Sequence, residues 1–103
     1  MATPCIVRFI QNGKPMCAFY KHHDGPDFKS KLEAFFSDKK VVSGLSLDPL
    51  NEVNGVADLA AQTIANFKTG PGDVYMVDAN DEEMYTYEVS IVDKTISVKT
   101  IEV

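Results

Sequence analysis

Two short runs of apolar and β-branched residues stand near the start of the chain, on either side of an Asn-Gly pair. Residues 4–11 read PCIVRFIQ, and residues 15–20 read PMCAFY. An Asn-Gly pair between such runs favours a two-residue turn, because both residues tolerate positive φ angles. We therefore predict a hairpin of two adjacent antiparallel strands. The register that follows from this turn places Cys17 opposite Arg8 and Cys5 opposite Tyr20.

Two later segments have the spacing of amphipathic helices. Pro26 suits the first turn of the earlier helix, because proline has no N–H to donate and its φ angle is already helical. Asn54 is expected to cap the later helix, and Gly70 followed by Pro71 is expected to end it. The predicted buried faces are Phe28, Leu32, Phe35 and Phe36 in the first helix, and Val56, Leu59, Ala60, Thr63, Ile64 and Phe67 in the second.

The segment between these helices has no clear period. In residues 40–54, turn residues alternate with single hydrophobes, so we expect an irregular connection that tucks Leu45, Leu47 and Leu50 inward. The pattern does not distinguish a lid from a packed loop.

Three strand-like runs complete the chain: DVYMVDA, MYTYEVSIV and TISVKTIEV. The acidic NDEE stretch, interpreted as a hairpin turn, separates the first two, and Asp93-Lys94 separates the last two. The middle run alternates apolar and polar residues, as a strand with one wet face does. The element order ββααβββ predicts a single α+β domain over residues 1–103. It has a mostly antiparallel five-stranded sheet, with two helices packed on one face.

Composition narrows the class of protein. Hydrophobic residues make up 45% and charged residues 24% of the 103 residues, which is ordinary for a folded domain. The net charge of -5 argues against general nucleic-acid binding, which needs a basic surface. No apolar run approaches the roughly 18 residues of a membrane span, and no secretory signal precedes the first strand. We expect a cytoplasmic protein.

The two cysteines are expected to stay reduced. In the predicted hairpin they lie about three residues out of register, or roughly 10 Å apart. A disulfide needs Cα atoms within about 7 Å. Cys5 and Cys17 are therefore interpreted as free thiols in a reducing compartment.

The most unusual polar stretch is FYKHHDGPDF, residues 19–28. Tyr20, Lys21, His22, His23 and Asp24 lie at the predicted end of a strand, where an anion or a partner is readily contacted. Histidine is a common acid, base and metal ligand. Neighbouring strand residues point to opposite faces, however, so the two histidines do not easily share one metal, and we predict no metal site. Asp24-Gly25-Pro26 also has the residues of a structural turn.

A second polar stretch, KTGPGD, resembles a phosphate loop only in composition. Phosphate loops open a helix, whereas this stretch follows one, so the negative end of the helix dipole faces it. A small anion nest built from the backbone of Lys68, Thr69, Gly70 and Gly72 stays open. DANDEE lacks the ligand ladder of a calcium loop. The usual hydrolase, metalloprotease and dinucleotide motifs are absent, so we predict no catalytic residues and no cofactor.

Both polar stretches resemble those of a family of small uncharacterised proteins found in phages, prophages and some bacteria. In that family a strand ends in Tyr-x-His-Trp-Asp-Gly-Tyr-Pro. A later Leu-Ala-Ala-Gln helix is followed by a Lys-x-x-Pro-Gly loop and a strand that contains tyrosine. The matching positions are Tyr20, His22, Asp24, Gly25, Leu59, Ala60, Ala61, Gln62, Lys68, Pro71, Gly72 and Tyr75.

This chain departs from the family pattern at two positions. His23 replaces the usual Trp, and Pro26 follows Gly25 without the intervening aromatic residue. If the region binds by aromatic stacking, this chain therefore lacks part of that contact or recognises a different ligand. The resemblance implies no established activity. It does imply that the protein serves a phage or mobile element and acts in the cytoplasm of the host cell. Small proteins of such elements often inhibit or sequester host-defence components.

Three functional hypotheses follow. The leading one is a non-catalytic phage-type binding protein that captures a small anionic molecule, such as a nucleotide signal, or docks on a host protein. Its site would be Tyr20 to Asp24 with the Lys68 to Gly72 loop. An alternative is a small hydrolase or nuclease that uses His22 or His23 as base with Asp24 orienting it. A third is an assembly protein that forms homodimers through an edge strand at residues 95–103.

Overall fold

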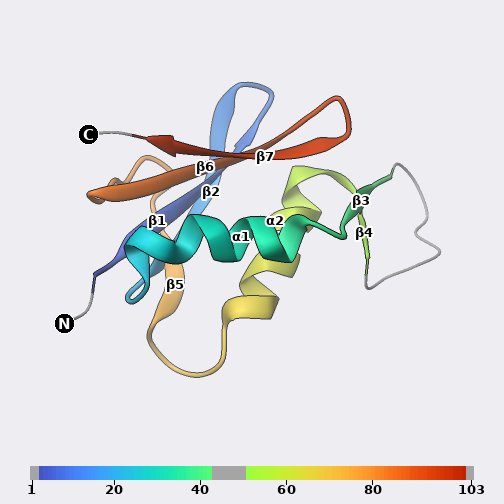
Figure 1. Ribbon diagram of the computed structural model, residues 1–103. Helices are drawn as coiled ribbons and strands as arrows, with labels where there is room; N and C mark the ends of the chain where they lie inside the picture. Colours follow the sequence, from blue (N-terminus) through green and yellow to red (C-terminus); the bar gives the residue numbers. More distant parts are fainter. Residues whose placement is uncertain (1–2, 43–50, 102–103) are drawn as a thin grey trace.

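The computed structural model describes residues 3–42 and 51–101 of the chain. Figure 1 shows a twisted five-stranded sheet and two helices. The elements in chain order are β1 (Cys5–Gln11), β2 (Lys14–Lys21), the 3-10 turn η1 (Gly25–Asp27), α1 (Phe28–Phe36), β3 (Lys40–Val41), β4 (Glu52–Val53), α2 (Gly55–Phe67), β5 (Val74–Val77), β6 (Tyr85–Val92) and β7 (Thr95–Ile101).

The predicted N-terminal hairpin is confirmed, with one change of register. Asn12 and Gly13 both have positive φ, as the expected turn requires. The pairing shifts between Phe9 and Ile10, so beyond that point Cys17 faces Phe9 and Cys5 faces Lys21. The predicted partners Arg8 and Tyr20 were therefore wrong by one residue, because a bulge adds a residue to one strand. Both cysteines are free, as expected.

The α+β class is confirmed, but the sheet is mixed rather than simply antiparallel. Its strand order is β5-β2-β1-β6-β7, and β1 pairs with β6 in parallel. β5 returns to pair with β2 instead of with β6. The acidic stretch at residues 78–83 is consequently not a hairpin turn. It belongs to a connection, residues 78–84, that crosses from one part of the sheet to the other.

Both helices pack on one face of the sheet. The ring of Phe67 at the end of α2 lies 4.8 Å from Phe28 and 5.7 Å from Phe35 of α1, measured between centroids. Asn54 precedes α2 as predicted, but its side chain does not cap the helix. The Asp58 carboxylate instead accepts the N–H of Asn54 at 2.8 Å. The buried core combines the helices with alternate strand residues: Cys5, Val7, Phe9, Phe19, Phe28, Leu32, Phe36, Val53, Val56, Leu59, Ala60, Val74, Tyr87 and Val89.

The opposite face of the sheet is partly covered by the 78–84 connection. Arg8, only 6% exposed, lies on this face and donates from Nε to the carbonyl of Ala79 (2.8 Å) and from Nη2 to that of Asp81 (2.9 Å). Its Nη1 also donates to Glu88 at 3.0 Å. Thr86, fully buried, donates to the carbonyl of Glu83 at 2.7 Å. The alternation of β6 had predicted a wet face here. The crossover buries Thr86, whereas Glu88 and Ser90 farther along the strand are half-buried.

The region between the helices contains one small additional feature. β3 and β4 form a short parallel pair. The expected inward packing of Leu45, Leu47 and Leu50 lies outside the described residues. Of the helices in the described ranges, none has the length and apolar character needed to span a membrane.

Candidate binding site

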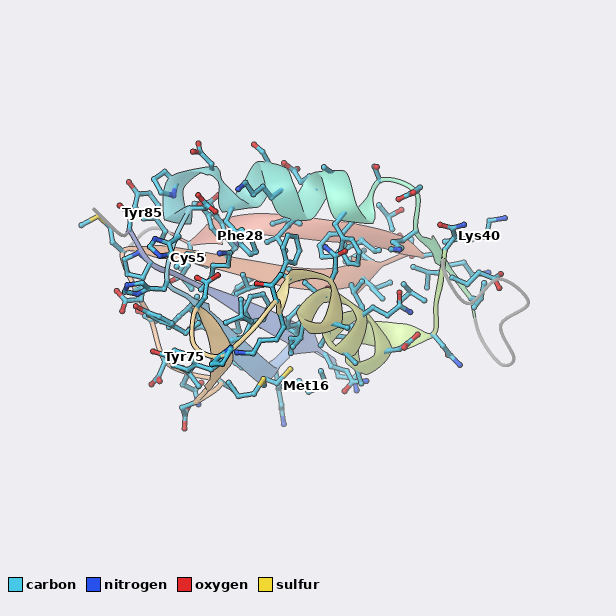
Figure 2. All side chains as sticks on the ribbon, turned by 90° about the horizontal axis from the view of Figure 1, so that it is seen from below. Cys5, Met16, Phe28, Lys40, Tyr75 and Tyr85 are labelled. Atoms are coloured by element: carbon cyan, nitrogen blue, oxygen red, sulfur yellow. The ribbon has the colours of Figure 1, made fainter. Side chains whose placement is uncertain are left out.

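The pairing of β2 with β5 brings the two polar stretches of the sequence together. Lys21 lies opposite Val74, and Tyr20 lies opposite Tyr75. Just beyond the strands, the N–H of His22 donates to the carbonyl of Asp73 at 2.8 Å. The loop that starts at Lys68 therefore runs beside residues 20–24, at one end of the sheet. Figure 2 shows Tyr75 and Tyr85 near this end of the molecule and Lys40 at the other.

Four rings form an aromatic edge at this end, which we define as Tyr20, His22, His23 and Tyr75. The rings of Tyr20 and Tyr75 stack, with centroids 4.8 Å apart and planes 27° from parallel. The His22 ring lies 5.9 Å from Tyr20, and His23 meets His22 edge-on at 4.8 Å. Tyr75 is 50% exposed, and both histidines are exposed. The aromatic edge is thus a preformed ring surface that is open to solvent.

A hydrogen bond joins the first two members of the aromatic edge. The Tyr20 hydroxyl lies 2.8 Å from Nδ1 of His22. Burial and the neighbouring Tyr75 raise the pKa of the Tyr20 hydroxyl, so it keeps its proton at neutral pH. Whichever of the two groups donates the hydrogen, Nε2 of His22 stays available to a partner. The bond fixes the orientation of the imidazole.

Lys21, by contrast, is turned away from solvent. It lies on the helix-covered face, is 7% exposed, and places Nζ 3.0 Å from Asp73 and 3.9 Å from Asp24. Nζ also lies 5.7 Å from the centroid of the Phe28 ring. The hydrogen bond from Lys21 lowers the pKa of the Asp73 carboxyl, and a hydrogen bond from Lys31 lowers that of Asp24. The charge of Lys21 is thus neutralised within the fold.

Lys68 is also engaged within the fold. Its Nζ donates to the carbonyl of Gly72 at 2.9 Å and to that of Val74 at 2.6 Å. Gly72 has a positive φ of 71°, which the turn into β5 requires. Thr69 and Gly70 are exposed at the loop surface. One carbonyl of the loop and one of β5 thus point at Lys68, a geometry that does not favour an anion nest.

The site has little of the geometry of a catalytic centre. The Asp24 carboxylate accepts a hydrogen bond from Lys31 at 3.0 Å, while His22 is held by the Tyr20 phenol. A histidine base is usually oriented by a carboxylate. In the described ranges, no three His, Cys, Asp or Glu side chains are placed to hold a metal ion.

A cavity of about 450 Å³ lies away from this site, between the end of α1 and the start of β7. The register of the sheet puts it at the opposite end from the aromatic edge. Its lining is mostly polar, so we assign the candidate site by its chemistry and not by concavity. The lining residues are Glu33, Phe36, Ser37, Lys39, Lys94, Thr95, Ile96 and Val98.

Reasoning from the residues alone missed two members of this neighbourhood. Asp73, the partner of Lys21, carries no sequence signal, because a lone aspartate after a glycine is common in turns. Tyr75 was marked only by the family resemblance. The cross-strand pairing of β2 with β5 is what places both beside the predicted residues.

Comparison with known proteins adds no relative: no protein family, curated protein or solved structure matches this chain.

Proposed function

We propose that this chain is a non-catalytic binding protein that docks on another protein through the aromatic edge. The observation that supports this best is the stack of the half-buried Tyr20 on the exposed Tyr75, with two exposed histidines beside it. Tyrosine is enriched among residues that dominate binding energy, because a rigid ring buries much area at low entropic cost. A ring pair that lies outside the core and is partly open to solvent fits such a contact.

The surroundings suggest the chemistry of the partner. One methionine at this end of the sheet, Met84, is 77% exposed. Met76 is 54% exposed but follows Tyr75 in β5, so its side chain points to the other face of the sheet. Methionine is enriched at interfaces, because it adapts to irregular surfaces. Asp81 and Glu82 are exposed on the nearby crossover. The partner expected is a protein that offers an apolar centre and a basic rim.

A small anion is a weaker candidate than the sequence had suggested. Lys21 and Lys68 were the expected anion contacts, and both donate to groups of the fold itself. Glu83 and Asp73 are close enough to raise the pKa of the Tyr20 hydroxyl. The local field is therefore unfavourable to a phosphate. We retain from the sequence motifs the proposal that the protein is of phage type, with a host-defence component as partner.

Site-specific crosslinking tests the proposal. A photoreactive phenylalanine analogue replaces Tyr75 in one version of the protein and Val92 in another. Val92 is a matched control, because it is 59% exposed but lies at the far end of β6. In the cells where the protein occurs, we expect a discrete product at position 75 that is absent at position 92.

Two further results bear on the proposal. The product at position 75 should disappear when Tyr20→Ala is added. Identical products at both positions would contradict docking at the aromatic edge. Native mass spectrometry of the purified chain, alone and with a nucleotide panel, tests the small-ligand hypothesis. A retained or added nucleotide mass would favour sequestration of a nucleotide over protein docking.

A further inference from the structure

The two margins of the sheet are unequal. β5 forms one margin and β7 the other (Figure 1). β5 has four residues, and Lys68 already donates to the carbonyl of its first residue, Val74. β7 has seven residues and pairs with β6 along its whole length. In the part of the chain that the structure describes, β7 is therefore the longer and less protected edge.

The turn before β7 determines which of its backbone groups point outward. Asp93 and Lys94 both have positive φ, so Val92 and Thr95 close a two-residue hairpin as a hydrogen-bonded pair. Hydrogen-bonded and non-hydrogen-bonded pairs alternate in an antiparallel ladder. Residues 96, 98 and 100 consequently direct their N–H and C=O groups away from β6. These six groups form a regular template for one more strand.

We infer that β7 pairs with β7 of a second copy of this chain, antiparallel about a two-fold axis at Val98. In this register Val98 faces Val98 of the other copy, and Ile96 faces Thr100. All six outward groups then find partners, which gives six intermolecular hydrogen bonds. The result is one continuous sheet of ten strands, from two sheets of five.

The side chains of β7 are compatible with this register. Ser97 of each copy faces Lys99 of the other, so no like charges meet. Within its own chain Lys99 lies opposite Glu88 of β6. Shifting the axis to Ser97 would leave the outward groups of Thr100 opposite the turn residue Lys94. Charge and hydrogen bonding together therefore favour the axis at Val98.

The inference is independent of the aromatic edge, because β5 and β7 are opposite margins of the sheet. Its test is the monomer–dimer dissociation constant, measured by sedimentation equilibrium. Ser97 is exposed and lies opposite Ser90 of its own chain, so charges placed there change the monomer little. Ser97→Lys opposes Lys99 of the other copy, and should weaken the dimer about fivefold. Ser97→Glu should tighten it about fivefold.

A backbone variant tests the same interface without charge. Thr100→Pro removes an N–H that points away from β6, so the ladder within the chain is kept. It should weaken the dimer at least about tenfold, since two intermolecular bonds are lost. Thr100→Ala keeps the N–H and is the matched control. Circular dichroism verifies that each variant folds.

Three results would overturn the inference. A strict monomer at high protein concentration would remove the dimer. A dimer unaffected by both Thr100→Pro and the Ser97 variants would place the interface elsewhere. Weakening by both Ser97→Lys and Ser97→Glu would reject the axis at Val98, because only an axis at Ser97 opposes like charges in both variants.

Discussion

Tyr20 and Tyr75 stack face to face, with ring centroids 4.8 Å apart, although they belong to stretches of the chain far apart in sequence. The pair is a direct consequence of β5 returning to β2. It sits on a strand pair and not on a mobile tip, which makes it a preorganised surface. Preorganisation lowers the entropic cost of binding.

The stack is expected to matter more for binding than for stability. Tyr75→Ala should lower the free energy of unfolding by about 1 kcal/mol, because the ring is half exposed and one aromatic pair is lost. It should weaken partner binding more than about tenfold if Tyr75 is a hot spot. Urea denaturation measures the change in stability. Titration with the partner protein that crosslinking identifies measures the change in affinity. A variant that binds normally would count against the proposed docking surface.

Arg8 should be among the most sensitive positions in the fold. Its guanidinium is buried and holds the 78–84 crossover through two carbonyls, and it also donates to Glu88 of β6. Arg8→Ala leaves these acceptors without a donor, and should cost about 3 kcal/mol. Arg8→Lys keeps the charge but not the fork of donors, so it should restore only part of the stability that Arg8→Ala loses. The urea midpoint and protease cleavage within residues 78–84 measure the change; an unaltered midpoint would be inconsistent with this role.

Gly25 is predicted to be required for packing and not for ligand contact. A Cβ at this position would lie 2.7 Å from the carbonyl oxygens of both Thr3 and Pro4. The backbone around it is also bonded, since its N–H donates to Thr3 and its carbonyl accepts from Tyr87. Gly25→Ala should cost about 2 kcal/mol. Gly70→Ala is the control, because nothing lies within 4 Å of a Cβ there. Equal thermal stability of the two variants would refute this interpretation.

The ion pairs of Asp73 and Asp24 with neighbouring lysines predict how stability depends on pH. Hydrogen bonds from Lys21 and Lys31 lower the pKa values of Asp73 and Asp24 in the folded protein. The unfolded chain therefore takes up these protons first as the pH falls. Their contribution to stability is present above the ordinary aspartate pKa of about 4 and is lost as the pH falls through the lowered values.

An Asp73→Asn variant tests this dependence. Between about pH 5 and about pH 3, its stability should fall less steeply than that of the wild type. Urea midpoints measured across that range provide the comparison. Parallel curves for the two proteins would show that the Lys21–Asp73 pair contributes no pH dependence.

The two thiols should differ in reactivity. Burial raises the pKa of Cys5 to about 12, and Cys5 is fully buried. Burial also raises the pKa of Cys17, but that residue is only partly buried. Because the thiolate is the reactive form, Cys17 should react first with a thiol reagent near pH 8, and Cys5 only after unfolding. Mass spectrometry of peptides after timed labelling distinguishes them; faster labelling of Cys5 would contradict the assignment.

Local signals were sufficient for most of the elements. Asn12-Gly13 predicts its hairpin because turn geometry depends on those two residues alone. The apolar spacing of Phe28 to Phe36 and of Val56 to Phe67 predicts α1 and α2, because helical periodicity is a property of adjacent turns. The cluster of unusual polar residues at the end of β2 was likewise visible as a pattern.

Properties that depend on contacts between distant segments could not be predicted from local sequence signals. The bulge beside Phe9, the parallel pairing of β1 with β6, and the crossover over Arg8 depend on how whole strands fit together. The same holds for the chemistry of the site. Sequence presents Lys21 and Lys68 as free cations.

By itself, then, the sequence determined which residues form helices, turns and strands, and which end of the hairpin gathers polar groups. Only the tertiary structure decided that Tyr75 and Asp73 join them. It also decided that Lys21 and Lys68 donate their hydrogen bonds to groups within the fold. The reason is physical. Backbone propensity acts over a few residues, whereas partner choice for a buried charge or an exposed ring depends on which distant strand lies alongside.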